Sequence, residues 1–259
     1  MKEKYKAPIV KKAFQILRLI SRNEQGMKIS ELSTSLGISK STVHGVTASL
    51  EELGAIIRDP QTKQYTLGVT LFELGRAAYA RIDVKDLARP FMEELMSKTQ
   101  ESVFLGVRNV NHVTILDIVE SMNELKITSP IGMTMPLLAG AIGKIFLAYM
   151  AETQAAELLR TRGLRRYTQN SITDPQVYAD QLRFSKKHGY ATDDEEYISG
   201  VRAVAAPIKT DGQLLAAIWV VGFKPSMGDV KMQTVIRETK AAAAGIGHKI
   251  ARRTASGVQ

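Results

Sequence analysis

The chain has 259 residues, a formal net charge of +9 and no cysteine. Without cysteine it can form no disulfide and no thiolate metal site, and it offers no thiol nucleophile. No apolar run approaches the roughly 20 residues of a membrane-spanning helix, and no signal-peptide pattern follows the charged N-terminus, so we expect a cytoplasmic protein without a membrane partner.

The positive charge is distributed unevenly along the chain. Residues 1–85 carry 14 Lys and Arg against 8 Asp and Glu, a net charge of +6, whereas the remaining residues carry 21 against 18, a net charge of +3. A chain of this length usually forms two domains. The uneven charge therefore predicts that the N-terminal domain binds a polyanion.

The first predicted helix covers residues 8–22. Its apolar residues recur at helical spacing and predict one buried stripe, formed by Val10, Ala13, Phe14, Leu17 and Ile20.

Two further helices are predicted, separated by Gly37, which can adopt the positive φ of a sharp turn. Ser30 and Ser39 are the expected N-caps of these helices. The apolar positions are Ile29, Leu32 and Leu36 in the first helix and Val43, Val46, Leu50 and Leu53 in the second. The pattern predicts a helix-turn-helix. An ordinary helical hairpin is the alternative, because short matches to this motif arise by chance.

The second of these helices has a polar outer face with no acidic residue before Glu51. Short hydrogen-bonding side chains let a helix approach base edges in the major groove, and a helix N-terminus attracts phosphate. Two β-type runs, 55–57 and 65–67, flank a turn-rich segment with two cations, which predicts a wing beside the DNA backbone. The expected DNA contacts are Ser30, Ser39, Lys40, Ser41, Thr42, His44, Gly45 and Thr47 on the helices, and Arg58, Lys63 and Gln64 on the wing. We therefore expect a winged helix-turn-helix domain over residues 1–68.

A linker helix is predicted over residues 69–85. Its apolar side can pair with its copy in a second subunit or belong to the core of its own chain, and the pattern leaves both open. Asp86 is the expected N-cap of a further helix that continues to Gln100, which places a hinge at residues 83–86.

Residues 86–254 predict an α+β domain with a largely antiparallel sheet, followed by a loose tail at residues 255–259. Strands are expected at 102–107, 113–119, 125–128, 190–192, 201–208 and 214–223. Helices are expected at 137–150, 152–160, 175–188 and 229–253. Asp211-Gly212 is a turn signal between the last two strands.

Two segments of this domain carry a family resemblance. One is GMTMPLLAGAIGK at residues 132–144, and the other is GYATDDEE at residues 189–196, leading into GVRAVAAPI at 200–208. The second segment departs from the family pattern only at its end, where Lys209 and Thr210 replace an aromatic–acidic pair. With the winged helix, these segments make the chain resemble the IclR family of bacterial transcription regulators.

The resemblance implies a C-terminal GAF-like mixed α/β domain that binds a small organic or aromatic acid. It also implies dimers, or dimers of dimers, that bind palindromic promoter sites in double-stranded DNA as repressors or activators of catabolic genes.

The expected effector pocket combines this resemblance with the local pattern. Backbone N–H groups at the start of the apolar helix near Gly140 can hold a carboxylate, although the small residues there can equally serve tight helix–sheet packing. Strand alternation places Trp219 and Val221 on one face, which predicts an effector with an apolar or aromatic body unless Trp219 fills the cavity. The expected effector contacts are Met135, Leu137, Ala139, Gly140, Ala141, Asp193, Ala203, Trp219 and Val221.

Enzymatic activity, a metal site and a cofactor are not expected. The acids at residues 193–196 could suggest metal binding or acid–base chemistry, but a run of acids is usually a solvated loop. The resemblance instead makes Glu196 a buried anchor, with Arg202 as a candidate partner. Four scattered histidines and the absence of a Gly-x-Ser-x-Gly elbow leave no catalytic set.

An architectural DNA-binding protein without a ligand is a further alternative, but that role would not require so large a C-terminal domain. The sequence therefore predicts an effector-responsive transcription regulator.

Overall fold

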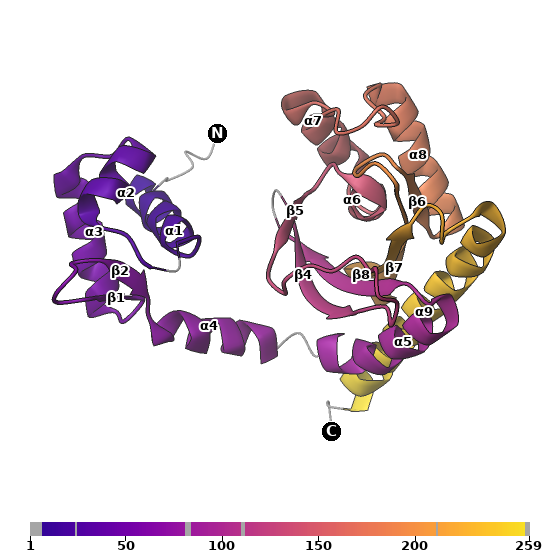
Figure 1. Cartoon of the computed structure of the whole chain (residues 1–259), viewed down its shortest axis with the longest axis horizontal. Helices are drawn as coiled ribbons and strands as arrows, with labels where there is room; N and C mark the ends of the chain where they lie inside the picture. Colours follow the sequence, from indigo (N-terminus) through magenta and orange to yellow (C-terminus); the bar gives the residue numbers. More distant parts are fainter. Residues whose placement is uncertain (1–6, 24, 81–83, 110–111, 211, 257–259) are drawn as a thin grey trace. The chain divides into compact units, whose positions relative to one another are not determined.

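Two structural units follow one another along the chain, Met1–Ile82 and Asp83–Gln259 (Figure 1). The computed structural model describes residues 7–23, 25–80, 84–109, 112–210 and 212–256. Within these ranges, no helix is both long and apolar enough to cross a membrane.

The first unit is a winged helix-turn-helix, as the sequence predicts. It contains α1 (Pro8–Ile20), α2 (Ile29–Leu36), α3 (Lys40–Glu52), β1 (Ile56–Arg58), β2 (Tyr65–Leu67) and α4 (Val69–Ala80). The two strands are antiparallel, and Ile56 lies opposite Leu67. The core of the unit is formed by residues that include Ile16, Ile20, Leu32, Val43, Val46, Ile56 and Tyr65.

The turn between α2 and α3 depends on the expected residues at two positions. Gly37 ends α2 with a φ of 62°, in the left-handed region that favours glycine. The Ser39 side chain accepts the Thr42 N–H at 3.3 Å and caps α3. The expected cap at Ser30 is wrong, because α2 begins two residues earlier: Lys28 is the N-cap, and its N–H donates to the Glu31 carboxylate at 2.7 Å.

The predicted apolar stripe of α1 is only partly buried. Ile16 and Ile20 are buried, whereas Val10 and Phe14 are 53% and 59% exposed. The core side of α1 is formed by Ile16 and Ile20, with Ala13 and Leu17 packed against it, and this side lies around the helix from Val10 and Phe14. The prediction for Val10 and Phe14 is therefore wrong for the isolated chain.

The second unit is built on a six-stranded sheet in which every neighbouring pair is antiparallel. The strands are β3 (Ser102–Arg108), β4 (His112–Val119), β5 (Thr134–Pro136), β6 (Ala191–Asp194), β7 (Val201–Thr210) and β8 (Gln213–Phe223), in the order β5-β4-β3-β8-β7-β6. The predicted strand at 125–128 is wrong. That segment lies in an irregular loop, closed by Lys126 and Thr128, whose side chains both contact the Glu120 carboxylate.

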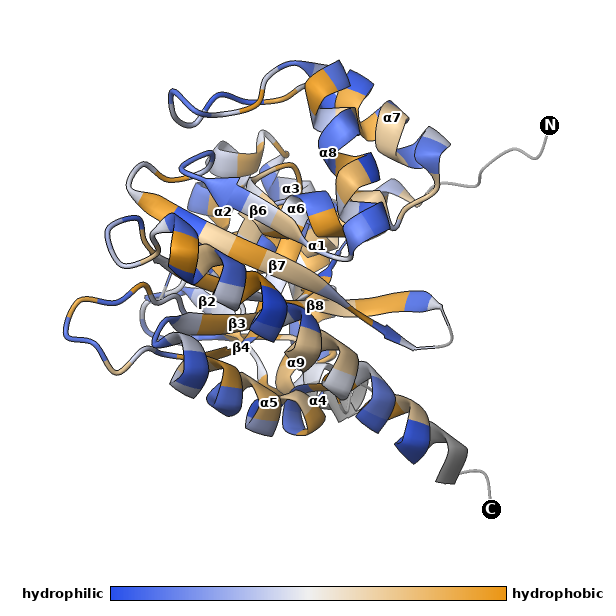
Figure 2. Ribbon diagram, turned by 90° about the vertical axis from the view of Figure 1, so that its right-hand side faces the viewer, coloured by the Kyte–Doolittle hydropathy of each residue, from blue (hydrophilic) through white to orange (hydrophobic). Residues whose placement is uncertain are grey.

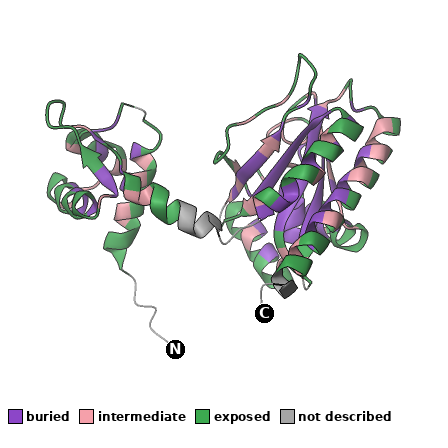
Figure 3. Ribbon diagram, turned by 90° about the horizontal axis from the view of Figure 1, so that it is seen from below, coloured by how far each residue is buried: buried purple, intermediate pink, exposed green. Residues whose placement is uncertain are grey.

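Helices cover both faces of this sheet (Figure 1). One face carries α5 (Val84–Thr99) and α9 (Asp229–Ser256), and the other carries α6 (Gly140–Ala148), with α7 (Glu152–Arg162) and α8 (Pro175–His188) beside it. The strands are largely buried, while the helices are exposed on their outer turns (Figure 3). Strands β7 and β8 are hydrophobic along most of their length (Figure 2), as expected for strands covered on both sides.

Two helix boundaries differ from the sequence prediction. Asp86 lies in the first turn of α5, which begins at Val84, so it is not the N-cap. Gly140 has a φ of 63° and begins α6, so the apolar run before it is a turn instead of helix. The start of α8 agrees with the predicted helix at 175–188, and the Asp174 carboxylate caps it by accepting the N–H groups of Gln176 and Val177.

Some predictions fall partly outside the described residues. Residues 81–83 of the expected linker and hinge, Asp211 of the expected turn, and residues 257–259 of the expected tail are not described. Residues 255–256 belong to α9.

Alternation along β8 is as predicted. Trp219 and Val221 belong to the core beneath α6, together with Ala203 and Ala205 of β7. Ile218 and Val220 are fully buried on the opposite face, which α5 and α9 cover. The side chains of Trp219 and Val221 therefore face the same layer as α6.

Candidate functional site

The outer face of α3 carries small and polar side chains. Lys40, Ser41, His44, Gly45 and Ser49 are all exposed, and the only long side chains among them are those of Lys40 and His44. A face of this kind can approach a nucleic-acid groove closely.

Thr47 does not belong to this face. It is fully buried, and its hydroxyl donates to the carbonyl oxygens of Val43 at 2.9 Å and His44 at 3.0 Å. The prediction that Thr47 contacts DNA is therefore wrong, because the preceding turn of the helix satisfies the hydroxyl inside the core. Thr42 is half-buried and bonded to the Ser39 hydroxyl at 2.8 Å, whereas Ser30 is exposed on α2.

The tip between β1 and β2 is held in one conformation by Asp59. The Asp59 carboxylate accepts the N–H groups of Gln61 at 2.8 Å and Thr62 at 2.7 Å. These two bonds, that of Thr62 first, lower the pKa of Asp59. Lys63 has a φ of 61° and is exposed, as is Arg58, so both predicted wing cations are accessible. Gln64 is half-buried.

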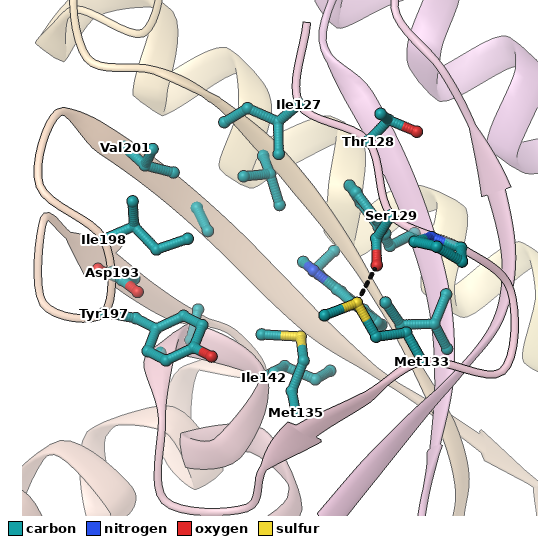
Figure 4. A pocket seen from close by; sticks show the side chains of 18 residues that line it. Ile127, Thr128, Ser129, Met133, Met135, Ile142, Asp193, Tyr197, Ile198 and Val201 are labelled. Carbon is teal, nitrogen blue, oxygen red and sulfur yellow. Dashed lines mark hydrogen bonds between the residues drawn. The ribbon is translucent and has the colours of Figure 1, made fainter. Parts of the chain in front are cut away.

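The second unit contains an apolar cavity of about 370 Å³ between the sheet, the start of α6 and the loop before β5. Most of its wall is aliphatic, aromatic or thioether surface, and among the described residues that line it Asp193 contributes the only carboxylate (Figure 4). Thr128, Ser129 and Tyr197 add hydroxyl groups to the wall. The Ser129 hydroxyl contacts the Met133 sulfur at 2.8 Å, which is a weak acceptor, so this hydroxyl remains available to a ligand.

Seven of the nine predicted effector residues line this cavity: Met135, Gly140, Ala141, Asp193, Ala203, Trp219 and Val221. Leu137 and Ala139 do not line it, because both are buried in the packing around the start of α6. The prediction that these two residues contact an effector is therefore wrong.

Sequence reasoning missed the remaining wall. The missed residues are Phe104, Ile115, Ile127, Thr128, Ser129, Pro130, Met133, Ile142, Tyr197, Ile198 and Val201. Phe104 is opposite Trp219 in the β3–β8 register, so correct pairing of these strands would have identified it. The residues at 127–133 lie in an irregular loop with no periodicity to reveal them.

Trp219 forms part of the cavity wall and does not fill the cavity. Its ring stacks on Phe104, with ring centroids 5.3 Å apart and an interplanar angle of 16°. Gly106 makes room for this ring, since a Cβ at that position would come within 2.9 Å of the indole. The flat stack keeps the indole against the sheet.

Asp193 lies at the end of the cavity nearest α6. It is 5% exposed, and its Oδ1 accepts the Glu196 N–H at 2.6 Å. Burial raises the pKa of Asp193 to about 6; the hydrogen bond from the Glu196 N–H and the charge of Lys144 oppose this shift, and the charge of Glu196 adds to it. A Cβ on Gly140 would come within 2.9 Å of Asp193 Oδ2, so glycine is needed where the carboxylate meets the helix.

Glu196 is anchored by Lys144, not by Arg202 as the sequence prediction suggested. Lys144 Nζ lies 2.6 Å from Glu196 Oε1 and also donates to the Thr192 carbonyl oxygen at 2.8 Å. Arg202 instead forms a bidentate pair with Asp194 and contacts Asp229. The Arg202 side chain therefore lowers the pKa of Asp194.

The four consecutive acids are thus engaged in separate structural contacts. Asp194 pairs with Arg202, Glu195 with Lys224 and Glu196 with Lys144, while Asp193 accepts a backbone N–H. Among the described residues, no group of three or more His, Asp or Glu side chains is arranged to hold a metal ion.

Comparison with known proteins gives the same picture for the whole chain. The family model of the IclR helix-turn-helix domain matches residues 9–60, and that of the bacterial transcriptional regulator IclR C-terminal domain matches residues 76–248. The HTH-type transcriptional regulator BhcR of Paracoccus denitrificans (strain Pd 1222) is 33% identical over 225 residues, which cover 86% of this chain and 80% of that protein.

Solved structures share the fold. An IclR transcriptional regulator from Alicyclobacillus acidocaldarius is similar with a TM-score of 0.79 at 27% identity, covering 95% of this chain and 99% of that one. An IclR homolog from Microbacterium hydrocarbonoxydans, complexed with 4-hydroxybenzoate, has a TM-score of 0.78 at 21% identity with the same coverage. Since the two family models span most of the chain in order, it belongs to the IclR family of bacterial transcriptional regulators.

Proposed function

We propose that this chain regulates catabolic genes in the cytoplasm by binding a palindromic promoter site and responding to a small carboxylic acid with an apolar or aromatic body. The acid binds in the cavity of the second unit, which we take to be of the GAF-like type. The observation that carries the proposal is the presence, in one chain, of an exposed polar α3 and a separate apolar cavity of about 370 Å³.

In the proposed complex, α3 enters the major groove. The exposed Ser41 and His44 side chains are the candidates for base contacts, and Ser39 and Lys40 at the helix N-terminus are candidates for phosphate contacts. Gly45 leaves space for close approach of the helix. The wing contributes Arg58 and Lys63 to the DNA backbone or minor groove.

A homodimer, alone or paired into a dimer of dimers, is the proposed assembly. Exposed apolar side chains of the first unit support it: Ile9, Val10 and Phe14 on α1, and Val69, Phe72 and Leu74 on α4 are each more than half exposed. Single exposed apolar residues are common, but two helices that each carry three are typical of an interface. These exposed side chains favour pairing of the linker helix with a second copy over a purely internal role.

The effector class follows from the cavity wall. The wall is dominated by apolar groups, and the stacked Phe104 and Trp219 rings offer a flat surface to an aromatic body. The complex of the Microbacterium hydrocarbonoxydans homolog with 4-hydroxybenzoate supports an aromatic acid as the first candidate.

The test is DNA binding by the full chain to genomic fragments at two salt concentrations, with and without a panel of aromatic and aliphatic carboxylic acids. We expect fragment-selective binding that weakens steeply with salt, because neutralised phosphates release counterions. One class of acid should change the affinity of the chain for the selected fragment.

Matched variants make this test specific. Ser41→Ala should weaken selective binding, whereas Arg160→Ala, which removes an exposed cation on α7, should leave it unchanged. If no fragment binds at either salt concentration, the proposal is wrong.

A further inference from the structure

The cavity offers a carboxylate no cation. None of the described residues that line it is Lys, Arg or His, and its one charged side chain is that of Asp193. A carboxylate ligand would therefore enter a mostly apolar space whose only full charge has the same sign. Two carboxylates close together in such a space cannot both remain ionised.

The start of α6 does not remove this conflict. A helix N-terminus ordinarily stabilises an anion, but Asp193 Oδ2 already lies so close to Gly140 that a Cβ there would come within 2.9 Å of it. The end of α6 that could receive a ligand carboxylate is therefore the end that Asp193 faces.

The N–H groups of Glu196 and Tyr197 donate to the Asp193 carboxylate, but the charged and titratable side chains around it bring no net positive charge. Lys144 of α6 faces it, but this ammonium group is paired with Glu196 at 2.6 Å. Tyr178 of α8 and Tyr197 of the loop after β6 are the remaining titratable neighbours, and neither supplies a positive charge. Asp193, Glu196 and Lys144 together carry one net negative charge when all three are ionised.

We infer that this cavity binds a carboxylate only together with a proton, which the carboxyl group of the ligand shares with Asp193, whereas a neutral hydrogen-bond donor of the same shape binds without one. The inference rests on the proposed function, because it concerns the same cavity, and it makes Asp193 the residue that selects the ligand head group. Burial already raises the pKa of Asp193 to about 6, so the proton is readily available near neutral pH.

The test uses benzoate and benzamide, which have nearly the same shape but differ in charge. Trp219 is the only tryptophan of the chain and lines the cavity, so its fluorescence reports occupancy. Between about pH 6 and about pH 8, the affinity for benzoate should fall by up to about tenfold per pH unit, because one proton must be taken up. The affinity for benzamide should stay constant or rise over the same range, since its amide donates to the ionised Asp193.

A direct count of protons gives a second measurement on the unaltered protein. Calorimetric titration of benzoate in two buffers with different heats of ionisation should show uptake of close to one proton at about pH 7.5, where Asp193 is largely ionised. Benzamide should show no uptake. This measurement needs no variant and is independent of any effect on folding.

Asp193→Asn provides the matched variant, because the asparagine oxygen can still accept the Glu196 N–H. It should bind benzoate with an affinity that no longer changes over this pH range. Asp180→Asn, an exposed substitution on α8 that also removes one carboxylate, should behave like the wild-type protein.

The failures of the two proposals are distinguishable. Binding of benzoate with a constant affinity and without proton uptake would overturn the proton linkage and leave the cavity as an effector site. No fluorescence change and no heat with either probe at any pH would overturn the proposed effector site itself.

Discussion

Lys144 and Glu196 form an ion pair that fastens the loop after β6 to the helix beneath it. The Lys144 side chain is 1% exposed and its Nζ lies 2.6 Å from Glu196 Oε1, across 52 residues of sequence. A charge in so apolar a helix is tolerated only when its donors are satisfied, and the carbonyl oxygen of Thr192 accepts a second bond from the same ammonium group. The pair thereby holds the segment that carries Asp193 against α6.

The first prediction concerns this ion pair. Lys144→Met should lower the free energy of unfolding of the second unit by about 3 kcal/mol, because it leaves the Glu196 carboxylate without its partner. Urea unfolding followed by Trp219 fluorescence measures the change. Adding Glu196→Gln to Lys144→Met should recover part of the loss, since the stranded charge is then removed; a single variant as stable as the wild-type protein would contradict the role given to the pair.

The second prediction concerns the space that Gly106 leaves for Trp219. Gly106→Ala places a methyl group within 2.9 Å of both the indole ring and the Thr114 carbonyl oxygen of β4, so the ring must move from its stack on Phe104 and the backbone of β4 must shift as well. We expect weaker binding of aromatic ligands and a stability loss of about 1–3 kcal/mol from overpacking. The measurement is ligand titration by calorimetry.

A compensating substitution tests the cause of that effect. In the double variant Gly106→Ala with Trp219→Phe, the smaller ring should tolerate the added methyl group and restore part of the affinity. If the single and double variants bind equally weakly, displacement of the ring is not the reason.

The third prediction separates two neighbouring residues of α3. His44 is exposed and Thr47 is fully buried. His44→Ala should weaken binding to the selected promoter fragment by about 1–3 kcal/mol, the usual value of a base contact, without changing thermal stability. Thr47→Val keeps the shape of the buried side chain and should leave DNA affinity within about twofold, with any loss appearing in stability instead. Gel-shift titration with parallel thermal melts checks both, and equal losses of affinity would contradict the assignment of the two faces.

The fourth prediction concerns the wing. Lys63 has a φ of 61°, so glycine is the substitution that removes its charge without adding backbone strain. Lys63→Gly should weaken binding to all DNA sequences alike and reduce the slope of log affinity against log salt by about 1, the effect of one lost phosphate contact. An unchanged slope would show that Lys63 does not contact a DNA phosphate.

The fifth prediction is the dependence of stability on pH. Burial raises the pKa of Asp193 to about 6, so the folded state binds the proton more tightly than the unfolded state. The stabilisation that this proton gives the folded state is complete below about pH 4 and is lost as the pH rises through about 6. The free energy of unfolding falls by about 3 kcal/mol over this range.

Asp193→Asn tests this directly, because it cannot ionise. Its stability relative to the wild-type protein should increase between about pH 4 and about pH 7.5. Urea unfolding at the two ends of that range provides the measurement. If the free energies of unfolding of the two proteins change equally with pH, burial of ionised Asp193 does not destabilise the folded state.

The first unit could be predicted well from sequence because its signals are local. Gly37, Ser39 and the apolar spacing of α3 from Val43 to Leu50 each act within one or two turns of helix, and each is found in its expected role. Leu53, the last residue of the predicted spacing, is 67% exposed. The errors have local causes too. Thr47 lies at a position whose hydroxyl can bond to the preceding turn, which makes a polar residue compatible with the core.

The cavity was harder to predict because its wall is not local. The alternation of β8 located Trp219 and Val221, but the loop at 127–133 has no periodicity. The sequence contains one signal for the partner of Glu196. Lys144 is a single charge in an apolar helix, and such a charge requires a buried partner. That Lys144 pairs with Glu196, and so leaves Asp193 as the charged side chain among the described residues of the wall, can be seen only from the three-dimensional contacts.

The wall of the cavity is formed by β3, β4, the loop before β5, β5, α6, β6, the loop after β6, β7 and β8, and therefore by residues from Phe104 to Val221. No segment shorter than residues 104–221 contains the whole site, and partial unfolding of the second unit removes it. Any ligand of the cavity must therefore stabilise the whole unit by mass action, by about 1.4 kcal/mol for each tenfold excess over its dissociation constant. For this unit, ligand occupancy of the cavity and the free energy of unfolding therefore rise together, because both depend on the same binding equilibrium.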